Sequence, residues 1–429
     1  MSKITCSAEF VFPGHPDKLS DAIADALVQE ASRREKRALV GVEVAVHRSS
    51  VFVTGRIGCT GANEIDIGDI VRNVYHSAGY GGDWGPAPDE LVIHTDLCLG
   101  PLEDGEAEFR SLADDQSICT GYATAIAETN HLPVEHWLAN RLGRRLAGLR
   151  TEAVGLELGP DGKVIVIVGI DDDRYCLEGF SCSLQQKSAS DGLGLHRAVR
   201  VTLEEEMKNL SKVCSRLAPD VPRELSVNGA GTFEVGGPEG DNGLSGKKLV
   251  VDAYGPRVPI GGGAMSGKDF FKVDRAGALH ARRVAKAVVV TGVAREALVR
   301  IGWFPGDRSA RLLSIEAEGG RSIDTGPWQD LFDLTLEASG EHWSNAADLV
   351  DVARYGHFTE VGRPWEMVRI LPSAITVPNH LLVGVERSTA NFLGTPKKRA
   401  EARVNNAEVG GDAGVARLEE ERHTVLLEI

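Results

Sequence analysis

The chain lacks any hydrophobic run approaching the ~20 residues that a bilayer-spanning helix needs. Residues 1–10 also lack the charged and apolar regions of a secretory signal peptide. The seven cysteines are an odd number and none stands in a C-x-x-C pair, which favours reduced thiols over disulfides or a structural zinc site. These absences predict a soluble protein of the cytoplasm.

Basic residues are scarce as well, because 47 Lys and Arg stand against 62 Asp and Glu, a formal net charge of −15. A general binder of nucleic acid or of an anionic membrane would carry a basic excess, so neither partner is expected. Any anionic ligand must therefore meet a local basic site. At 429 residues the chain is too long for one hydrophobic core, and we expect two or three domains.

Helical and strand-like patterns alternate from residue 16 to about 370, which favours layered α/β or α+β architecture. Pro16 followed by Leu or Ile at every fourth position over 19–27 predicts a helix. Alternating valines over 42–53 predict a hairpin. The further expected elements are a strand at 163–168 entered through a turn at 160–162, a helix over 203–217, a strand at 247–252 and a helix over 278–288.

Glycines and charged residues concentrate in three segments. They are G-H-P-D-K at 14–18, G-G-P-E-G-D-N-G-L-S-G-K-K at 236–248, and G-G-G-A-M-S-G-K-D at 261–269 followed by K-V-D-R at 272–275. Glycine lets the backbone approach a ligand closely, and its N–H groups can bind phosphate oxygens.

The charged side chains in these segments suit a polyphosphate. Lys268 and Lys272 are four residues apart and would point the same way on a helical turn. Asp17 and Asp274 could hold Mg²⁺, which takes one or two carboxylates together with phosphate oxygens. The Walker pattern is absent because Asp269 follows Gly267-Lys268. The residues alone thus indicate an enzyme that acts on a nucleotide phosphate.

Taken together, the segments resemble the S-adenosylmethionine synthetase (methionine adenosyltransferase) family. That family's G-H-P-D-K, G-G-P-x-G-D-x-G-L-[ST]-G-[RK]-K, V-D-x-Y-G, G-G-G-A-x-S-G-K-D and K-V-D-R occur in order at 14–18, 236–248, 251–255, 261–269 and 272–275. The order and approximate spacing match over roughly residues 4–370.

The resemblance implies an α/β (α+β) fold of three similar, interleaved subdomains in a pseudo-threefold arrangement. The expected boundaries are 1–11 plus 126–231 for the N-terminal subdomain, 12–101 plus 232–276 for the central one, 102–125 plus 277–372 for the C-terminal one, and 373–429 for a C-terminal extension. It also implies a homodimer or homotetramer with active sites at the subunit interface.

The implied reaction transfers the adenosyl group of ATP to the sulfur of L-methionine and then cleaves the released tripolyphosphate, with Mg²⁺ and K⁺. His15 would assist departure of the triphosphate. By resemblance, the site comprises His15, Lys248 and Lys268 as catalytic residues; Lys247, Lys272, Phe233, Asp115 and Asp241 as ATP or phosphate ligands; Asp17 and Asp274 for Mg²⁺; and Glu43 for K⁺.

The chain departs from the family pattern on the acceptor side. D-A-K-S-Q falls at 152–156, which puts Val154 where the family has a catalytic lysine. Arg56 replaces the glutamate that recognises the methionine ammonium, and Arg can instead bind a carboxylate or phosphate. The gating loop at 98–101 lacks its glutamine, and Trp303 and Phe304 bring bulky rings to the family's G-V-A-E-P. Arg56, Val154 and Trp303 are therefore the candidate acceptor-site residues.

Three hypotheses remain open at this point. The protein is an adenosylmethionine synthetase with unusual loops, or a divergent relative that uses ATP with another acceptor, such as an acidic one or water. The third hypothesis is a nucleotide-binding paralogue without synthetase activity. Retention of the phosphate-binding residues counts against the third.

Overall fold

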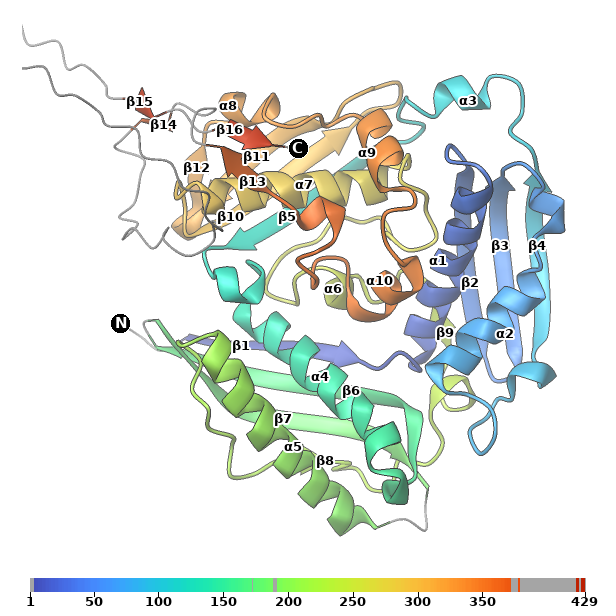
Figure 1. Ribbon diagram of the computed structural model, residues 1–429, viewed down its shortest axis with the longest axis vertical. Helices are drawn as coiled ribbons and strands as arrows, with labels where there is room; N and C mark the ends of the chain where they lie inside the picture. Colours follow the sequence, from blue (N-terminus) through green and yellow to red (C-terminus); the bar gives the residue numbers. More distant parts are fainter. Residues whose placement is uncertain are drawn as a thin grey trace, which may run out of the picture.

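Helices and sheets alternate along the chain in the computed structural model, which describes residues 4–171, 173–187 and 191–371 and three short strands beyond them. Most of the predicted extension 373–429 lies outside the described residues. The mixed α/β fold is confirmed, with helices packed against three four-stranded sheets (Figure 1).

Each of the three sheets combines strands that are distant in sequence. The first has the order β1-β6-β7-β8, with β1 (Ile4–Val11), β6 (Leu158–Asp171), β7 (Arg174–Gln186) and β8 (Ser226–Val227). The second has the order β4-β3-β2-β9, with β2 (Leu39–His47), β3 (Ser50–Gly58), β4 (Val92–Gly100) and β9 (Gly243–Leu244). The third has the order β12-β11-β10-β5, with β5 (Ser117–Thr124), β10 (Glu296–Trp303), β11 (Arg311–Ala317) and β12 (Arg321–Ile323). The strands of the three sheets are thus interleaved along the chain, while the expected subdomain boundaries stay a prediction.

The long helices cover one face of each sheet (Figure 1). These are α1 (Pro16–Arg34) on β2, α4 (Val134–Glu152) on β1 and β6, and α7 (Val273–Val290) on β5 and β10. Two further helices, α2 (Ile67–Ala78) and α5 (Gly192–Val213), pack against α1 and α4 respectively. Shorter elements are α3 (Glu106–Phe109), α6 (Leu249–Asp252), α8 (Gly326–Gln329), α9 (Leu336–Trp343), α10 (Leu349–Tyr355), and the two-stranded pairs β13 (Arg369–Leu371) with β16 (Leu426–Glu428) and β14 (Val377–Pro378) with β15 (Arg422–His423).

The sequence patterns predict most of the helices and strands around the glycine-rich segments correctly, with two exceptions. The expected strand at 247–252 is wrong, because residues 249–252 form α6. A short apolar run has no periodicity that separates a strand from one buried helical turn. The expected turn at 160–162 is also wrong, since these residues continue β6 and the register with β7 shifts there instead. A β-bulge tolerates Pro160, which cannot donate a ladder hydrogen bond.

The face of each sheet opposite its helices carries exposed apolar side chains. Ile165 and Ile167 of β6 alternate with fully buried valines, and Phe52 of β3 and Ile118 of β5 are 49% and 60% exposed. Large exposed apolar side chains on several strands are typical of surfaces that contact another chain. Separately, none of the helices in the described ranges is long and apolar enough to cross a membrane.

A glycine of α4 tests the packing of this helix on β1. A Cβ at Gly143 would lie 2.1 Å from Cδ1 of the buried Phe10, whereas a Cβ at Gly148 would first meet the end of the flexible Glu152 side chain at 3.2 Å. We expect Gly143→Ala to lower the free energy of unfolding by about 1–3 kcal/mol. The matched Gly148→Ala is expected to raise it by about 0.5–1 kcal/mol. Urea denaturation of both variants gives the comparison, and equal stability of the two would contradict the packing.

Candidate active site

His15 caps the N-terminus of α1. Its Nδ1 accepts a hydrogen bond from the backbone N–H of Asp17 at 3.2 Å, which places the proton of a neutral ring on Nε2. The pKa of His15 is lowered to about 4, chiefly by burial, with a smaller contribution from the charges of Lys248 and Lys163 and against the opposing effect of Asp17. At neutral pH the ring is therefore uncharged and can donate a hydrogen bond from Nε2.

Asp17 holds the two lysines that end the second glycine-rich segment. Its Oδ1 is 3.6 Å from Lys247 Nζ, and its Oδ2 is 3.5 Å from Lys248 Nζ. Oδ1 also accepts the backbone N–H of Leu244 at 3.1 Å. The Asp17 side chain is only 2% exposed, so a buried carboxylate fixes two ammonium groups at one end of α1.

Lys163 belongs to the same cluster, although the sequence patterns do not place it among the site residues. Its Nζ is 2.5 Å from Glu9 Oε2, while Glu9 Oε1 is 4.0 Å from Lys248 Nζ. One carboxylate of β1 therefore lies between a lysine of β6 and a lysine of the glycine-rich segment. The pairing of β1 with β6, which joins residues far apart in the chain, creates this arrangement.

A cavity of about 400 Å³ opens beside this first lysine cluster. It is lined by His15 and Lys163 and by the predicted ATP ligands Phe233 and Asp241. Asp161 lies in the wall, where it accepts the backbone N–H of Gly237 at 2.7 Å and burial raises its pKa to about 6. The structure thus brings together residues of α1, β6 and the segment before β9.

A second lysine cluster lies where α7 begins. Lys268 Nζ donates to Asp274 Oδ2 at 2.5 Å, and the Ser117 hydroxyl donates to Asp274 Oδ1 at 2.6 Å. Lys272 forms an ion pair with Asp114. Two cations and two carboxylates thus neutralise one another.

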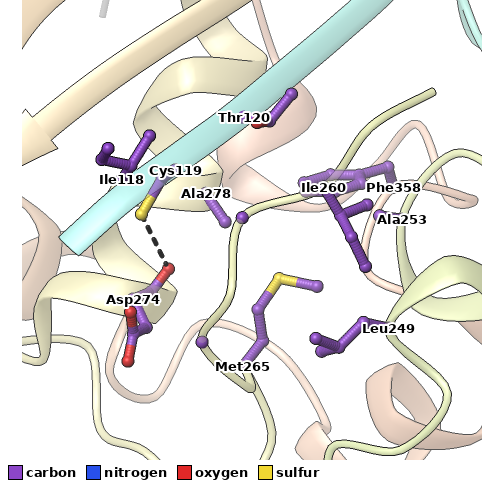
Figure 2. Close-up of a pocket in the computed structure, with 12 residues that line it drawn as sticks. Ile118, Cys119, Thr120, Leu249, Ala253, Ile260, Met265, Asp274, Ala278 and Phe358 are labelled. Atoms are coloured by element: carbon purple, nitrogen blue, oxygen red, sulfur yellow. Dashed lines mark hydrogen bonds between the residues drawn. The ribbon is translucent and has the colours of Figure 1, made fainter.

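The third glycine-rich segment passes close to Asp274 and a small apolar hollow (Figure 2). A Cβ at Gly263 would lie 2.0 Å from Asp274 Cγ, so this approach needs glycine. Cys119 Sγ donates to the backbone carbonyl of Asp274 at 3.6 Å, and Met265 lines the hollow opposite (Figure 2). This packing fixes the segment that carries Lys268.

Strand β2 runs between the two clusters. Ala45 pairs with Leu244 next to the first cluster, and Gly41 pairs with Lys268 in the second. Four residues of an extended strand span about 13 Å. Glu43, the predicted K⁺ ligand, lies between these two points on β2. Within one chain, the two lysine-bearing segments are therefore anchored about 13 Å apart.

The carboxylates fit Mg²⁺ only together with a ligand's own oxygens. In the part of the chain that the structure describes, no group of three or more His, Cys, Asp and Glu side chains could hold a metal ion. Mg²⁺ is commonly held by one or two carboxylates plus substrate phosphates, and Asp17 and Asp274 each supply one carboxylate beside lysines. Glu43 Oε2 accepts from the Ser245 hydroxyl at 3.0 Å, so oxygen donors are also adjacent at the predicted K⁺ position.

Two of the predicted acceptor-site residues lie away from the cavity. Val154 lies on a 3₁₀ turn after α4 with its side chain 74% exposed, and it does not line the cavity. The lysine that lines the cavity is Lys163. It belongs to Asp161-Gly162-Lys163, which has the Asp-x-Lys spacing of the family's D-A-K. Residues 161–163 therefore match the D-A-K part of the motif at the cavity, whereas residues 152–156 do not line it. Trp303 is 1% exposed and packs in the core near Gly277, so its ring is part of the fold rather than a wall of the cavity.

Arg56 lies on β3 and forms an ion pair with a carboxylate of its own chain. Its Nη2 donates to Glu106 Oε2 at 2.6 Å and lies 3.7 Å from Glu103 Oε1. This hydrogen bond lowers the pKa of Glu106. Asp115, a predicted ATP ligand, is exposed, and its Oδ1 accepts the backbone N–H of Gln116 at 2.7 Å. The structure brings neither Arg56 nor Asp115 to the cavity that holds His15.

A mixed α/β fold that gathers lysines and carboxylates on glycine-rich backbone is typical of proteins that bind a polyphosphate. Family models for the N-terminal and C-terminal domains of S-adenosylmethionine synthetase match residues 3–96 and 235–367. The S-adenosylmethionine synthase of Prochlorococcus marinus (strain MIT 9303) is 32% identical over 404 residues, which cover 86% of this chain and 95% of that protein. That of Thermus thermophilus is 33% identical over 394 residues, which cover 84% and 95%. The chain belongs to the S-adenosylmethionine synthetase family.

The pKa of His15 tests the electrostatics of the first cluster. We expect its ring proton resonances, assigned by their loss in His15→Asn, to titrate near pH 4 rather than near 6.5. Lys163→Met should raise the midpoint, because it removes a positive charge. Since the unfolded chain binds this proton below about pH 6.5 and the folded one does not, this group makes the fold less stable as pH falls from 6.5 towards 4. A midpoint near 6.5 in the intact protein would contradict the buried, cation-flanked position of His15.

Proposed function

We propose that the protein transfers the adenosyl group of ATP to the sulfur of L-methionine and hydrolyses the released tripolyphosphate to phosphate and diphosphate. The observation that carries this proposal is the convergence of His15, Asp17, Lys163, Lys247 and Lys248 beside one cavity. The relatives named above are S-adenosylmethionine synthases, which supports the same chemistry.

The first step forms a bond between sulfur and the ribose C5′ while the bond from C5′ to the triphosphate oxygen breaks. Negative charge then builds on the departing oxygen. The neutral His15 ring donates from Nε2 to this oxygen, and Lys163 and Lys248 offset the charge without moving far, because Glu9 and Asp17 already hold them. Phe233 lies in the cavity wall, where its ring can pack on the adenine base.

The second step adds water across a phosphoanhydride of the tripolyphosphate. We assign Lys268 and Lys272 to the phosphates, where they exchange Asp274 and Asp114 for phosphate oxygens. Mg²⁺ bound through Asp17 and Asp274 would neutralise phosphate charge, and K⁺ would bind at Glu43.

A second copy of the chain accounts for the separation of the two clusters. Lys247 and Lys248 contact Asp17 whereas Lys268 contacts Asp274, so the segments anchored about 13 Å apart in one chain form two separate clusters. The exposed apolar sheet faces offer a surface on which a homodimer or homotetramer can form. We therefore propose active sites between subunits, with the first cluster of one chain facing the second cluster of its partner. The cytoplasmic location stays a prediction.

The reaction is tested by incubating the protein with ATP, Mg²⁺ and K⁺, with and without methionine, and identifying the products by mass spectrometry. We expect methionine-dependent S-adenosylmethionine together with phosphate and diphosphate. Lys163→Met and Lys268→Met should each lower turnover by about 100-fold or more, since each removes a fixed charge from the site. Lys212→Met, on the exposed surface of α5, is the matched control. If the intact protein leaves the ATP unchanged, only the hypothesis of a nucleotide-binding paralogue without synthetase activity remains.

A second candidate is the same adenosyl transfer to an acidic acceptor or to water. Arg56 favours it, because its guanidinium already binds the carboxylate of Glu106. A guanidinium that holds one carboxylate can exchange it for another, whereas it repels an ammonium group.

The charge of Arg56 distinguishes the two acceptors. If the acceptor is acidic, we expect Arg56→Glu and Arg56→Gln to lower the kcat/KM for thioethers with an additional carboxylate by about tenfold or more, equivalent to roughly 1.4 kcal/mol of lost charge-assisted bonding. The kcat/KM for methionine should be unchanged or higher. Unaltered preference among acceptors in both variants would remove Arg56 from the acceptor site.

A further inference from the structure

Three aspartates follow one another at four-residue intervals on α1, and each is buried. They are Asp17, Asp21 and Asp25, at 1%, 0% and 0% exposure. Residues four apart on a helix lie on the same face, about 6 Å from one another along the axis. The same face of α1 therefore presents three carboxylates in a row.

Each carboxylate in this row accepts a backbone N–H from a glycine-rich segment. Asp17 Oδ1 accepts from Leu244 at 3.1 Å, and Asp21 Oδ1 accepts from Gly246 at 2.7 Å. Asp25 Oδ1 accepts from Gly267 at 3.0 Å. The segment with Lys247 and Lys248 is thus bonded to Asp17 and Asp21, and the segment with Lys268 to Asp25.

Asp21 and Asp25 differ from Asp17 in their other partners. Asp21 is 3.2 Å from the buried Lys18 Nζ, and Asp25 binds Arg275 Nη2 through both oxygens at 2.8 and 2.6 Å. Arg275 Nη1 also donates to the backbone carbonyl of Lys268 at 2.8 Å. Arg275 pairs with Asp25, and the buried Lys18 is shared between Asp21 and Asp252, whereas Asp17 contacts Lys247 and Lys248.

We propose that Asp21 and Asp25 are positioning residues that fix the two lysine-bearing segments on one rigid helix and so set the spacing of the two half-sites within a chain. The proposal rests on the proposed function. The spacing follows from the helix itself, because eight residues from Asp17 to Asp25 rise about 12 Å. This agrees with the roughly 13 Å along β2, so a helix and a strand hold the same two segments at the same separation.

The test separates local anchoring from general stability. In Asp21→Ala, we expect hydrogen exchange of the backbone amides of 244–248 to accelerate about tenfold or more, with 266–268 unaffected. In Asp25→Ala, 266–268 should accelerate and 244–248 should not. Ser20→Ala is the matched control, since Ser20 is buried on the same helix and its hydroxyl donates to Pro16 within α1. Equal acceleration across the protein in either variant would overturn the anchoring.

Nucleotide binding tests the consequence for the site. We expect each alanine variant to raise the Kd for ATP with Mg²⁺ at least tenfold. Asp21→Asn and Asp25→Asn keep an accepting oxygen, so their Kd should be close to that of the intact protein. Local acceleration of exchange without any change in Kd would overturn the positioning role and the proposed phosphate role of the segments, while leaving the anchoring itself intact.

Folding of the variants is the remaining requirement. If the alanine variants do not fold, the asparagine variants decide, because loss of the charge alone should still speed exchange severalfold in the matching segment. If the two asparagine variants show the same exchange rates in 244–248 and in 266–268, the proposal is overturned.

Discussion

Hydrogen bonds from two glycine-rich backbone segments to buried carboxylates of α1 are the constraint on which the candidate site depends. Glycine-rich backbone is free to adopt many conformations, so by itself it places a lysine poorly. The bonds to Asp21 and Asp25 remove that freedom, and the buried partners Lys18 and Arg275 oppose the rise in pKa that burial imposes on the two carboxylates. The cations are thereby ordered before any ligand arrives, which is the condition under which fixed charges stabilise a transition state most strongly.

The site also depends on pairings between distant parts of the chain. Glu9 of β1 meets Lys163 because β1 pairs with β6, and the segment at 244–245 meets Glu43 because β9 pairs with β2. Helix α1 and strand β2 then set one separation between the two lysine clusters. Under the proposed function, this separation gives each chain two half-sites that a second copy would complete.

Much of this arrangement can be predicted from the sequence, because motifs report local chemistry well. Lys268, Lys272, Asp17 and the mixed α/β fold follow from the glycine-rich motifs and alternating periodicities, while the roles of His15, Lys247 and Lys248 follow from the resemblance to the family. Lys163 could not be predicted from periodicity, since it stands at the start of an apolar run, directly after Pro160-Asp161-Gly162, and its place in the cavity depends on the tertiary structure. The sequence does contain a signal for Lys163, which is the Asp-x-Lys spacing at 161–163. The prediction of a turn at 160–162 assigns these residues to a loop instead of to the motif. The helix at 249–252 and the burial of Trp303 could not be predicted for a related reason. A short apolar run does not show whether it is a strand or a helical turn, and a single ring does not show whether it lines a site or fills a core.

A crystal structure with a non-hydrolysable ATP analogue and Mg²⁺ tests the central claim most directly. The account predicts that one triphosphate contacts Lys163, Lys247 and Lys248 of one chain and Lys268 and Lys272 of a second chain, with Asp21 and Asp25 still bonded to the two segments. A triphosphate bound elsewhere, or bound with the two segments detached from α1, would contradict it.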